Sequence, residues 1–302
     1  MKVAVAGASG FIGSALVRRL EADGHRVVRL VRRTAERPDE VAWHPSSSEI
    51  EQWDRLEGVE AIVNLTGANL AAGRWTDERR EELRRSRIEG TRTLVAVVAH
   101  MNHHPRAFVC ASAVGFYGDR GEEELSEASG AGQGFLADLC HAWEEEARIA
   151  ESVGVRTVLL RMGLVLGPGG GVLAKMLPAF RAGVGGRLGS GRQWVSWIAL
   201  EDLLAVIGHV LADGRLAGPV NAVAPGPVRN VEFADTLGGV LGRPALLPVP
   251  AVMLRTLFGS MADEALLASA RVRPQRLLEA GFAFRHTGLA GALRAALAAT
   301  AR

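Results

Sequence analysis

The chain has 302 residues, a length that fits one large domain or two coupled domains. Hydrophobic residues make up 48% and charged residues 23%, and this ordinary globular balance excludes a disordered or low-complexity chain. The net charge is only +2 and the basic residues are dispersed along the sequence, so we expect no nucleic-acid partner.

Nothing in the sequence indicates a membrane, secreted or metal-binding protein. No apolar run approaches the roughly 18 residues of a membrane span, and the apolar start of the chain is too short for a signal peptide. The two cysteines, Cys110 and Cys140, exclude a disulfide scaffold and a self-contained zinc site. We therefore expect a cytoplasmic protein with no metal ion and no membrane partner.

Strand and helix patterns alternate over the first two-thirds of the chain. Short apolar runs predict strands at residues 2–6, 27–31, 61–65, 107–111 and 157–160. Helical periodicity predicts helices at residues 11–23, about 76–100 and about 135–153. This alternation is typical of right-handed βαβ units, so we expect an α/β fold with a parallel sheet.

The pattern changes after Arg161. Glycine-rich segments at 163–171 and 183–191 are followed by a predicted helix at 200–212 and a predicted strand at 219–222. The rest of the chain reads as short helices. We therefore predict a nucleotide-binding domain at residues 1–165, to which 200–224 return, and a smaller, mainly helical substrate region at 166–199 and 225–302.

A glycine motif lies between the first predicted strand and the first predicted helix. Residues 7–13 spell G-x-x-G-x-x-G. Gly7 permits a tight turn, Gly10 leaves room for a pyrophosphate, and Gly13 allows the helix and strand to pack closely. The N–H groups of the helix start would then face the anion. The motif predicts a dinucleotide site.

The end of the second strand indicates which dinucleotide binds. NAD sites usually carry an acidic residue there, but this chain has Val31-Arg32-Arg33. An arginine suits a 2′-phosphate because its planar donors carry a positive charge. We therefore predict NADP(H); the alternative is a solvated basic loop.

Further motifs carry a family resemblance. They lie at residues 64–68 (NLTGA), 112–118 (SAVGFYG), 161–167 (RMGLVLG), 193–198 (QWVSWI), 221–225 (NAVAP) and 281–284 (GFAF). Over essentially its whole length the chain resembles the atypical extended short-chain dehydrogenases/reductases that are labelled epimerase family proteins. The resemblance implies a Rossmann-type, doubly wound sheet with NADP(H) along the strand ends.

The resemblance also implies the residues around the cofactor. The pyrophosphate would be bound by Gly7, Ser9, Gly10, Phe11, Ile12 and Gly13. The 2′-phosphate would lie at Arg32 and Arg33, and the adenosine side would be lined by Leu65, Thr66, Gly67, Glu82 and Arg87. Val165 would lie near the nicotinamide. Without the resemblance, Glu82 and Arg87 read as a surface charge pair.

The Tyr-x-x-x-Lys pair of catalytically competent relatives is missing. The only tyrosine, Tyr117, is followed four residues later by Gly121, and the only lysines, Lys2 and Lys175, are remote. Hydride transfer from a carbinol needs a base near the cofactor. The helix at residues 135–140, where the pair belongs, offers only apolar residues and a cysteine at the relevant positions.

Other residues are candidates for the missing chemistry. Ser112 follows the fourth strand, and we expect it to hydrogen-bond the substrate oxygen. Tyr117 is the first candidate acid/base, and Asp138 and His141 are others. Alternatively, Tyr117 only packs, Asp138 complements the helix dipole, and His141 is solvated.

The second half offers a substrate pocket. Gln193, Trp194 and Trp197 combine aromatic faces with hydrogen-bonding groups on one short segment. The alternative is that one or both tryptophans belong to the core. Lys175 is a candidate for binding an anion or, equally, a surface lysine.

Two functions fit these features. The first is an NADP(H)-dependent oxidoreductase or epimerase acting on a small polar molecule; a nucleotide sugar is implied by the family label alone. The second is a non-catalytic NADP(H)-binding module that reports redox state to a protein partner.

Overall fold

The computed structural model describes residues 1–45, 47 and 49–298. An eight-stranded sheet with the order β12-β8-β6-β5-β1-β2-β3-β4 forms its centre. The strands are β1 (Lys2–Ala6), β2 (Arg26–Val31), β3 (Glu40–His44), β4 (Glu49–Ile50), β5 (Ala61–Asn64), β6 (Ala107–Ala113), β8 (Arg156–Met162) and β12 (Gly218–Ala222). Only β4 pairs antiparallel. The expected Rossmann-type α/β fold is confirmed.

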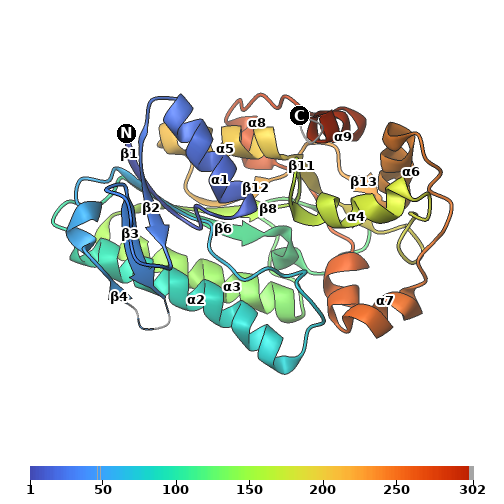
Figure 1. Ribbon diagram of the computed structural model, residues 1–302, viewed down its shortest axis with the longest axis horizontal. Coiled ribbons are helices and arrows are strands. Elements are labelled where there is room, and N and C mark those ends of the chain that lie inside the picture. The colour runs from blue at the N-terminus through green and yellow to red at the C-terminus, as the bar shows by residue number, and fades with distance from the viewer. Residues whose placement is uncertain (46, 48, 299–302) are drawn as a thin grey trace.

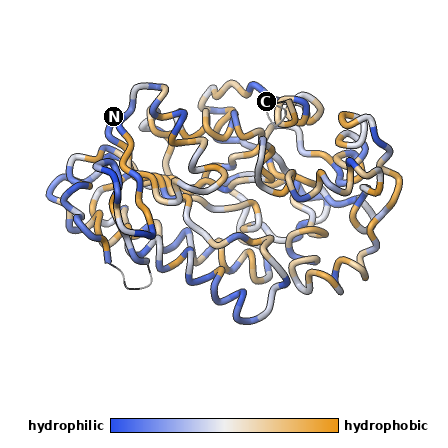
Figure 2. Tube along the Cα trace, viewed as in Figure 1, coloured by the Kyte–Doolittle hydropathy of each residue, from blue (hydrophilic) through white to orange (hydrophobic). Residues whose placement is uncertain are grey.

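Helices cover both faces of the sheet (Figure 1). On one face, α1 (Phe11–Ala22) and α5 (Leu200–Ala212) bury leucines and valines against alternate residues of β1, β5, β6 and β8. On the other face, α2 (Asp77–His100) and α3 (Phe135–Arg148) do the same. Figure 2 shows the hydrophobic strands between these layers and the hydrophilic outer side of α2.

The helices α1 and α2 differ in how their first turns are capped. The Thr76 side chain caps α2 by accepting a hydrogen bond from the backbone N–H of Arg79 at 3.2 Å, and Asp77 and Glu78 complement the helix dipole. By contrast, α1 begins at Gly10, which has no side chain to cap it. Its first N–H groups are therefore available to a ligand.

Most of the remaining elements follow in the second half of the chain. The helices are α4 (Gly171–Arg181), α6 (Asn230–Leu241), α7 (Ala251–Phe258), α8 (Gln275–Glu279) and α9 (Leu289–Ala298), and α8 packs at the start of β12. Short strand pairs join β9 (Leu164–Leu166) to β11 (Trp197–Ala199), β10 (Trp194–Val195) to β13 (Val228–Arg229), and β7 (Glu124–Leu125) to β14 (Arg271–Val272). A separate core unites α4, α6 and α9. Single-turn helices lie at Trp53–Leu56, Val114–Tyr117, Ile149–Val153 and Ala262–Leu266.

The structure adds two strands to the central sheet that the sequence patterns did not predict, and the short strand pairs outside that sheet were not predicted either. β3 pairs in parallel with β2, although residues 32–39 between them contain no helix. β4 is only two residues long. β12 returns to the sheet beside β8, as expected for residues 219–222, while the exact domain boundaries stay a prediction. No helix among the described residues is long and apolar enough to cross a membrane.

Candidate functional site

The glycine turn joins the end of β1 to the start of α1. Gly7 has φ +82°, a region that favours glycine, and a Cβ there would lie 2.8 Å from the Leu65 carbonyl oxygen. A Cβ on Gly13 would lie 2.0 Å from the Gly7 carbonyl oxygen. Neither position accepts a side chain, so the turn brings bare backbone and an uncapped helix start to one place. This arrangement can bind a phosphate.

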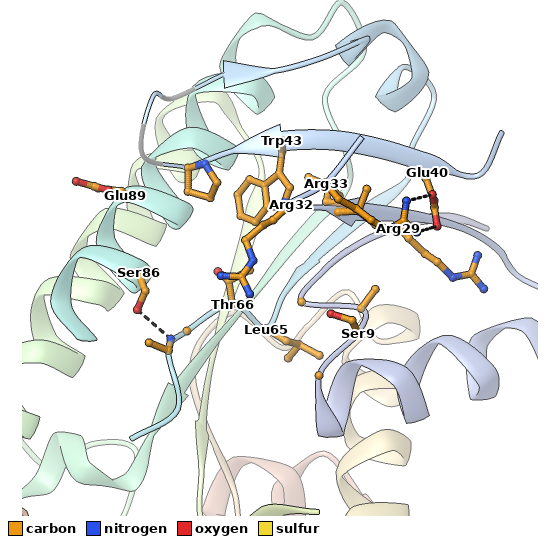
Figure 3. A pocket seen from close by; sticks show the side chains of 18 of the residues that line it. Ser9, Arg29, Arg32, Arg33, Glu40, Trp43, Leu65, Thr66, Ser86 and Glu89 are labelled. Atoms are coloured by element: carbon orange, nitrogen blue, oxygen red, sulfur yellow. Dashed lines mark hydrogen bonds and ion pairs between the residues drawn. The ribbon is translucent and has the colours of Figure 1, made fainter. Parts of the chain in front are cut away.

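A cavity of about 820 Å³ opens beside this turn (Figure 3). It is bounded by the carboxyl ends of β1, β2 and β5 and by one face of α2. Nine of the predicted cofactor residues line it: Gly7, Ser9, Gly10, Arg32, Arg33, Leu65, Thr66, Gly67 and Glu82. The topology therefore gathers residues that the sequence spreads over 76 positions.

The other predicted cofactor residues do not line this cavity. Ile12 and Gly13 lie in the first turn of α1, and Val165 lies in β9. The Phe11 ring packs against the loop before α4, so closely that a Cβ on Gly170 would lie 2.3 Å from its Cδ2 atom. Whether these residues contact a cofactor stays a prediction.

The arginines at the end of β2 have different environments. Arg33 donates to both carboxylate oxygens of Glu40, at 3.0 and 2.8 Å, and Arg37 donates to the same carboxylate at 3.1 Å. The Arg33 guanidinium is the main reason that the pKa of Glu40 falls to about 2. Arg32 has no hydrogen bond or ion pair among the described residues. Figure 3 shows its side chain extending from β2 toward Thr66.

Glu82 and Arg87 do not form the surface pair considered as an alternative. Glu82 pairs with Arg79 and is half-exposed. Arg87 is buried, donates to the carbonyl oxygens of Leu83 and Ala68 at 3.1 and 3.2 Å, and lies over the Trp143 ring. Burial lowers the pKa of Arg87 to about 10.

Ser112 and Tyr117 belong to one buried network. The Ser112 hydroxyl donates to Glu144 at 2.7 Å, and Arg161 donates to both oxygens of Glu144 at 2.8 Å. Arg161 also donates to the Tyr117 hydroxyl at 3.0 Å, and that hydroxyl lies 2.7 Å from Asn221 Oδ1. All five residues are at most 3% exposed.

This network gives Tyr117 a structural role. Its hydroxyl is fully buried and has partners for its proton and its lone pairs, and burial raises its pKa. A group with these properties exchanges protons poorly with a ligand. The geometry therefore favours the packing interpretation of Tyr117, while Ser112 keeps only its lone pairs for a substrate.

The helix that would carry the missing pair, α3, has one acid on its buried face, Glu144, and Arg161 binds that carboxylate. Leu136 and Cys140 lie four residues apart on α3, and a Cβ added to Gly115, after β6, would lie 3.4 Å from the Leu136 Cβ and 3.9 Å from the Cys140 Sγ. Burial raises the pKa of Cys140 to about 11, so its thiol is inert. Asp138 and His141 are exposed, and His141 stacks on the Phe116 ring.

The predicted substrate-pocket residues do not border the described cavity. Trp197 is fully buried and donates to the Gly226 carbonyl at 2.9 Å, so it belongs to the core. Gln193 donates to the carbonyl oxygens of Leu188 and Leu266, and Trp194 lies between two arginines. Lys175 donates to the Ala71 carbonyl and so joins α4 to the loop after β5.

Several cavity residues escaped the sequence analysis. Trp43 and Pro45 come from the unpredicted strand β3 and the turn after it. The wall on α2 is made by Glu82, Arg85, Ser86 and Glu89. Residues three or four positions apart share one face of a helix. Arg85, Ser86 and Glu89 could therefore have been predicted from their spacing relative to Glu82.

Comparison with known proteins decides the family. A model of the NAD dependent epimerase/dehydratase family matches residues 3–222. The chain belongs to this family. A second model, for a domain of unknown function called DUF1731, matches residues 249–296. The resemblance drawn from the motifs is thereby confirmed.

Relatives in the epimerase family match the chain over nearly its whole length. An epimerase family protein of Mycobacterium bovis is 45% identical over 291 residues, covering 96% of each chain. The crystal structure of the human epimerase family protein SDR39U1 (isoform 2) with NADPH has a TM-score of 0.89 at 34% identity, covering 98% of this chain and 99% of that one. A nucleoside-diphosphate sugar epimerase from Corynebacterium glutamicum has a TM-score of 0.79 at 34% identity, with 98% of this chain matching 58% of that one.

Proposed function

We propose that the protein binds NADP(H) in the cavity beside the glycine turn and acts as an oxidoreductase or epimerase on a small polar substrate. The observation that carries the proposal is the combination of an uncapped glycine turn with Arg32, a cation that has no partner among the described residues, at the end of β2. A cavity of about 820 Å³ is in the size range of cofactor sites. The human relative crystallised with NADPH supports the choice of cofactor.

The residues present fit this cofactor. The glycine turn has no Cβ that would block a pyrophosphate, and the N-terminal N–H groups of α1 lie beside it. Arg32 would bind the 2′-phosphate, and Leu65, Thr66 and Gly67 would line the adenosine side. When bound, NADP(H) supplies a hydride donor or acceptor.

Ser112 is our candidate for binding the substrate oxygen. Because it donates its own proton to Glu144, it would accept a hydrogen bond from a substrate hydroxyl. A nucleotide sugar is the substrate class that the name of the Corynebacterium relative supports.

A second function is favoured by one specific observation. Ser112, Tyr117 and their partners satisfy one another in the core, and α3 offers Leu136 and Cys140 where relatives have their catalytic pair. This is the pattern of a protein that binds NADP(H) without turnover and signals redox state to a protein partner. Oxidation of bound NADPH by any member of an aldehyde, ketone and quinone panel would exclude this second function.

The cofactor assignment is tested by calorimetric titration of the variant Arg32→Ala with NADPH and NADH. We expect a loss of at least tenfold in NADPH affinity, about 1.4 kcal/mol, with little change for NADH. Arg18→Ala is the matched control, because Arg18 is exposed on α1 and does not line the cavity. An Arg32→Ala variant that keeps the preference of the wild type would contradict the assignment.

A further inference from the structure

Five arginines line the cavity, and most of their charge is already neutralised by nearby carboxylates. Arg29 pairs with Glu21 and Asp39. Arg33 and Arg37 both pair with Glu40. The two cavity arginines that have no hydrogen bond or ion pair among the described residues are Arg32 and Arg85. These two are therefore the side chains with charge available to an anionic ligand.

The two free arginines come from different walls. Arg32 follows β2, whereas Arg85 is exposed on α2, between Glu82 and Glu89 on the face that borders the cavity. Figure 3 shows Ser86 and Glu89 on the α2 wall, across the cavity from Arg29 and Glu40. The Ser86 hydroxyl accepts a hydrogen bond from the Ala68 N–H at 2.9 Å and so ties α2 to the loop after β5. This hydrogen bond fixes the α2 backbone next to Arg85 relative to the loop after β5.

Two of the three acidic residues that line the cavity are neutralised by ion pairs, so they repel an anion near Arg32 and Arg85 only weakly. Glu40 is neutralised by Arg33 and Arg37, and Glu82 pairs with Arg79. Of the acidic residues that line the cavity, Glu89 is the one without an ion pair among the described residues. It lies one helical turn after Arg85, and its charge acts on Arg92, which does not line the cavity.

A phosphate monoester carries a charge of about −1.5 to −2 at neutral pH, and one guanidinium cannot balance it. We infer that Arg85 supplies the second positive charge for the 2′-phosphate of NADP(H), from the α2 wall opposite Arg32. The inference rests on the proposed cofactor. It assigns to α2 a part in distinguishing NADPH from NADH that the motif at the end of β2 does not reveal.

The experiment compares two neighbouring arginines of α2. Arg85→Ala and the control Arg84→Ala remove the same charge from adjacent positions, but Arg84 does not line the cavity. Both are titrated calorimetrically with NADPH, NADH, 2′,5′-ADP and 5′-AMP, after circular dichroism has checked their folding. For Arg85→Ala we expect NADPH and 2′,5′-ADP to bind at least about tenfold more weakly, as for the loss of a hydrogen bond to a charged group, with NADH and 5′-AMP unchanged. Arg84→Ala is expected to match the wild type.

Four results would overturn the inference. Equal losses for Arg85→Ala and Arg84→Ala would mean that only the general positive field matters. Equal losses for NADPH and NADH would place Arg85 at a group that both cofactors share. If Arg32→Ala loses the NADPH preference while Arg85→Ala keeps it, the inference fails and the proposed function stands. If the wild type has no preference for NADPH, both fail.

Discussion

Single side chains divide the predicted site into a cofactor part and an enclosed part. Arg32 borders the cavity with no partner among the described residues, whereas Tyr117 is enclosed by Arg161 and Asn221. The sequence alone predicted an arginine, Arg32, directly after β2. It could not predict that Arg33 is bound by Glu40, because that carboxylate comes from a strand with no clear pattern.

Tyr117→Phe distinguishes a structural role from a catalytic one. The variant leaves the Asn221 amide oxygen and one Arg161 N–H without their shared partner, which costs about 1–3 kcal/mol for buried groups. We expect urea unfolding to show this loss, with NADPH affinity unchanged. Normal stability combined with lost turnover would instead identify Tyr117 as an acid/base.

The lowered pKa of Glu40 predicts how the free energy of unfolding depends on pH. Its pKa is lowered from 4.5 to about 2 by Arg33, so the ion pair stabilises the folded state above pH 4.5, and this stability is lost as the pH falls toward 2. Wild type and Glu40→Gln should therefore differ in free energy of unfolding at pH 6 and converge toward pH 2. A difference that does not change between these two pH values would show that Glu40 is not held by its arginines.

At the scale of elements, strong hydrophobic patterns gave reliable predictions. β1, β2, β5, β6 and β8 lie where apolar runs predicted strands, because each strand is buried on both faces of a parallel sheet. β3 was missed because it begins with the charged residue Glu40, whose burial depends on its ion pairs with Arg33 and Arg37. The predicted helix at 135–153 ends as an α-helix at Arg148.

The glycine turn gives the sharpest prediction at this scale. A Cβ in Gly13→Ala would lie 2.0 Å from the Gly7 carbonyl oxygen, so the variant must separate α1 from the turn. We expect it to lose both stability and NADPH binding. Gly208→Ala is the control, because this glycine lies in α5 and a Cβ added there would meet no atom within 4 Å, so alanine should stabilise the helix by up to about 1 kcal/mol. Undiminished NADPH binding by Gly13→Ala would contradict the role of the turn.

At the scale of the whole molecule, the fold assembles the cofactor side from distant segments. Parallel strands bring Gly7, Arg32 and Thr66 to one edge of the sheet, and α2 closes the cavity from the side. The motifs at the strand ends predicted Gly7, Arg32 and Thr66, whereas the cavity residues from β3 and most of those from α2 were not predicted. The buried network around Glu144 and Arg161 joins α3 to β6 and β8, and sequence spacing carries no signal for such contacts.

The central claim is that this member of the epimerase family binds NADP(H). Calorimetric titration of the wild-type protein with NADPH and NADH tests it most directly. We expect NADPH to bind at least about tenfold more tightly than NADH, because Arg32 lines the cavity and is proposed to bind the 2′-phosphate. Equal binding of the two nucleotides, or no binding of either, would contradict it.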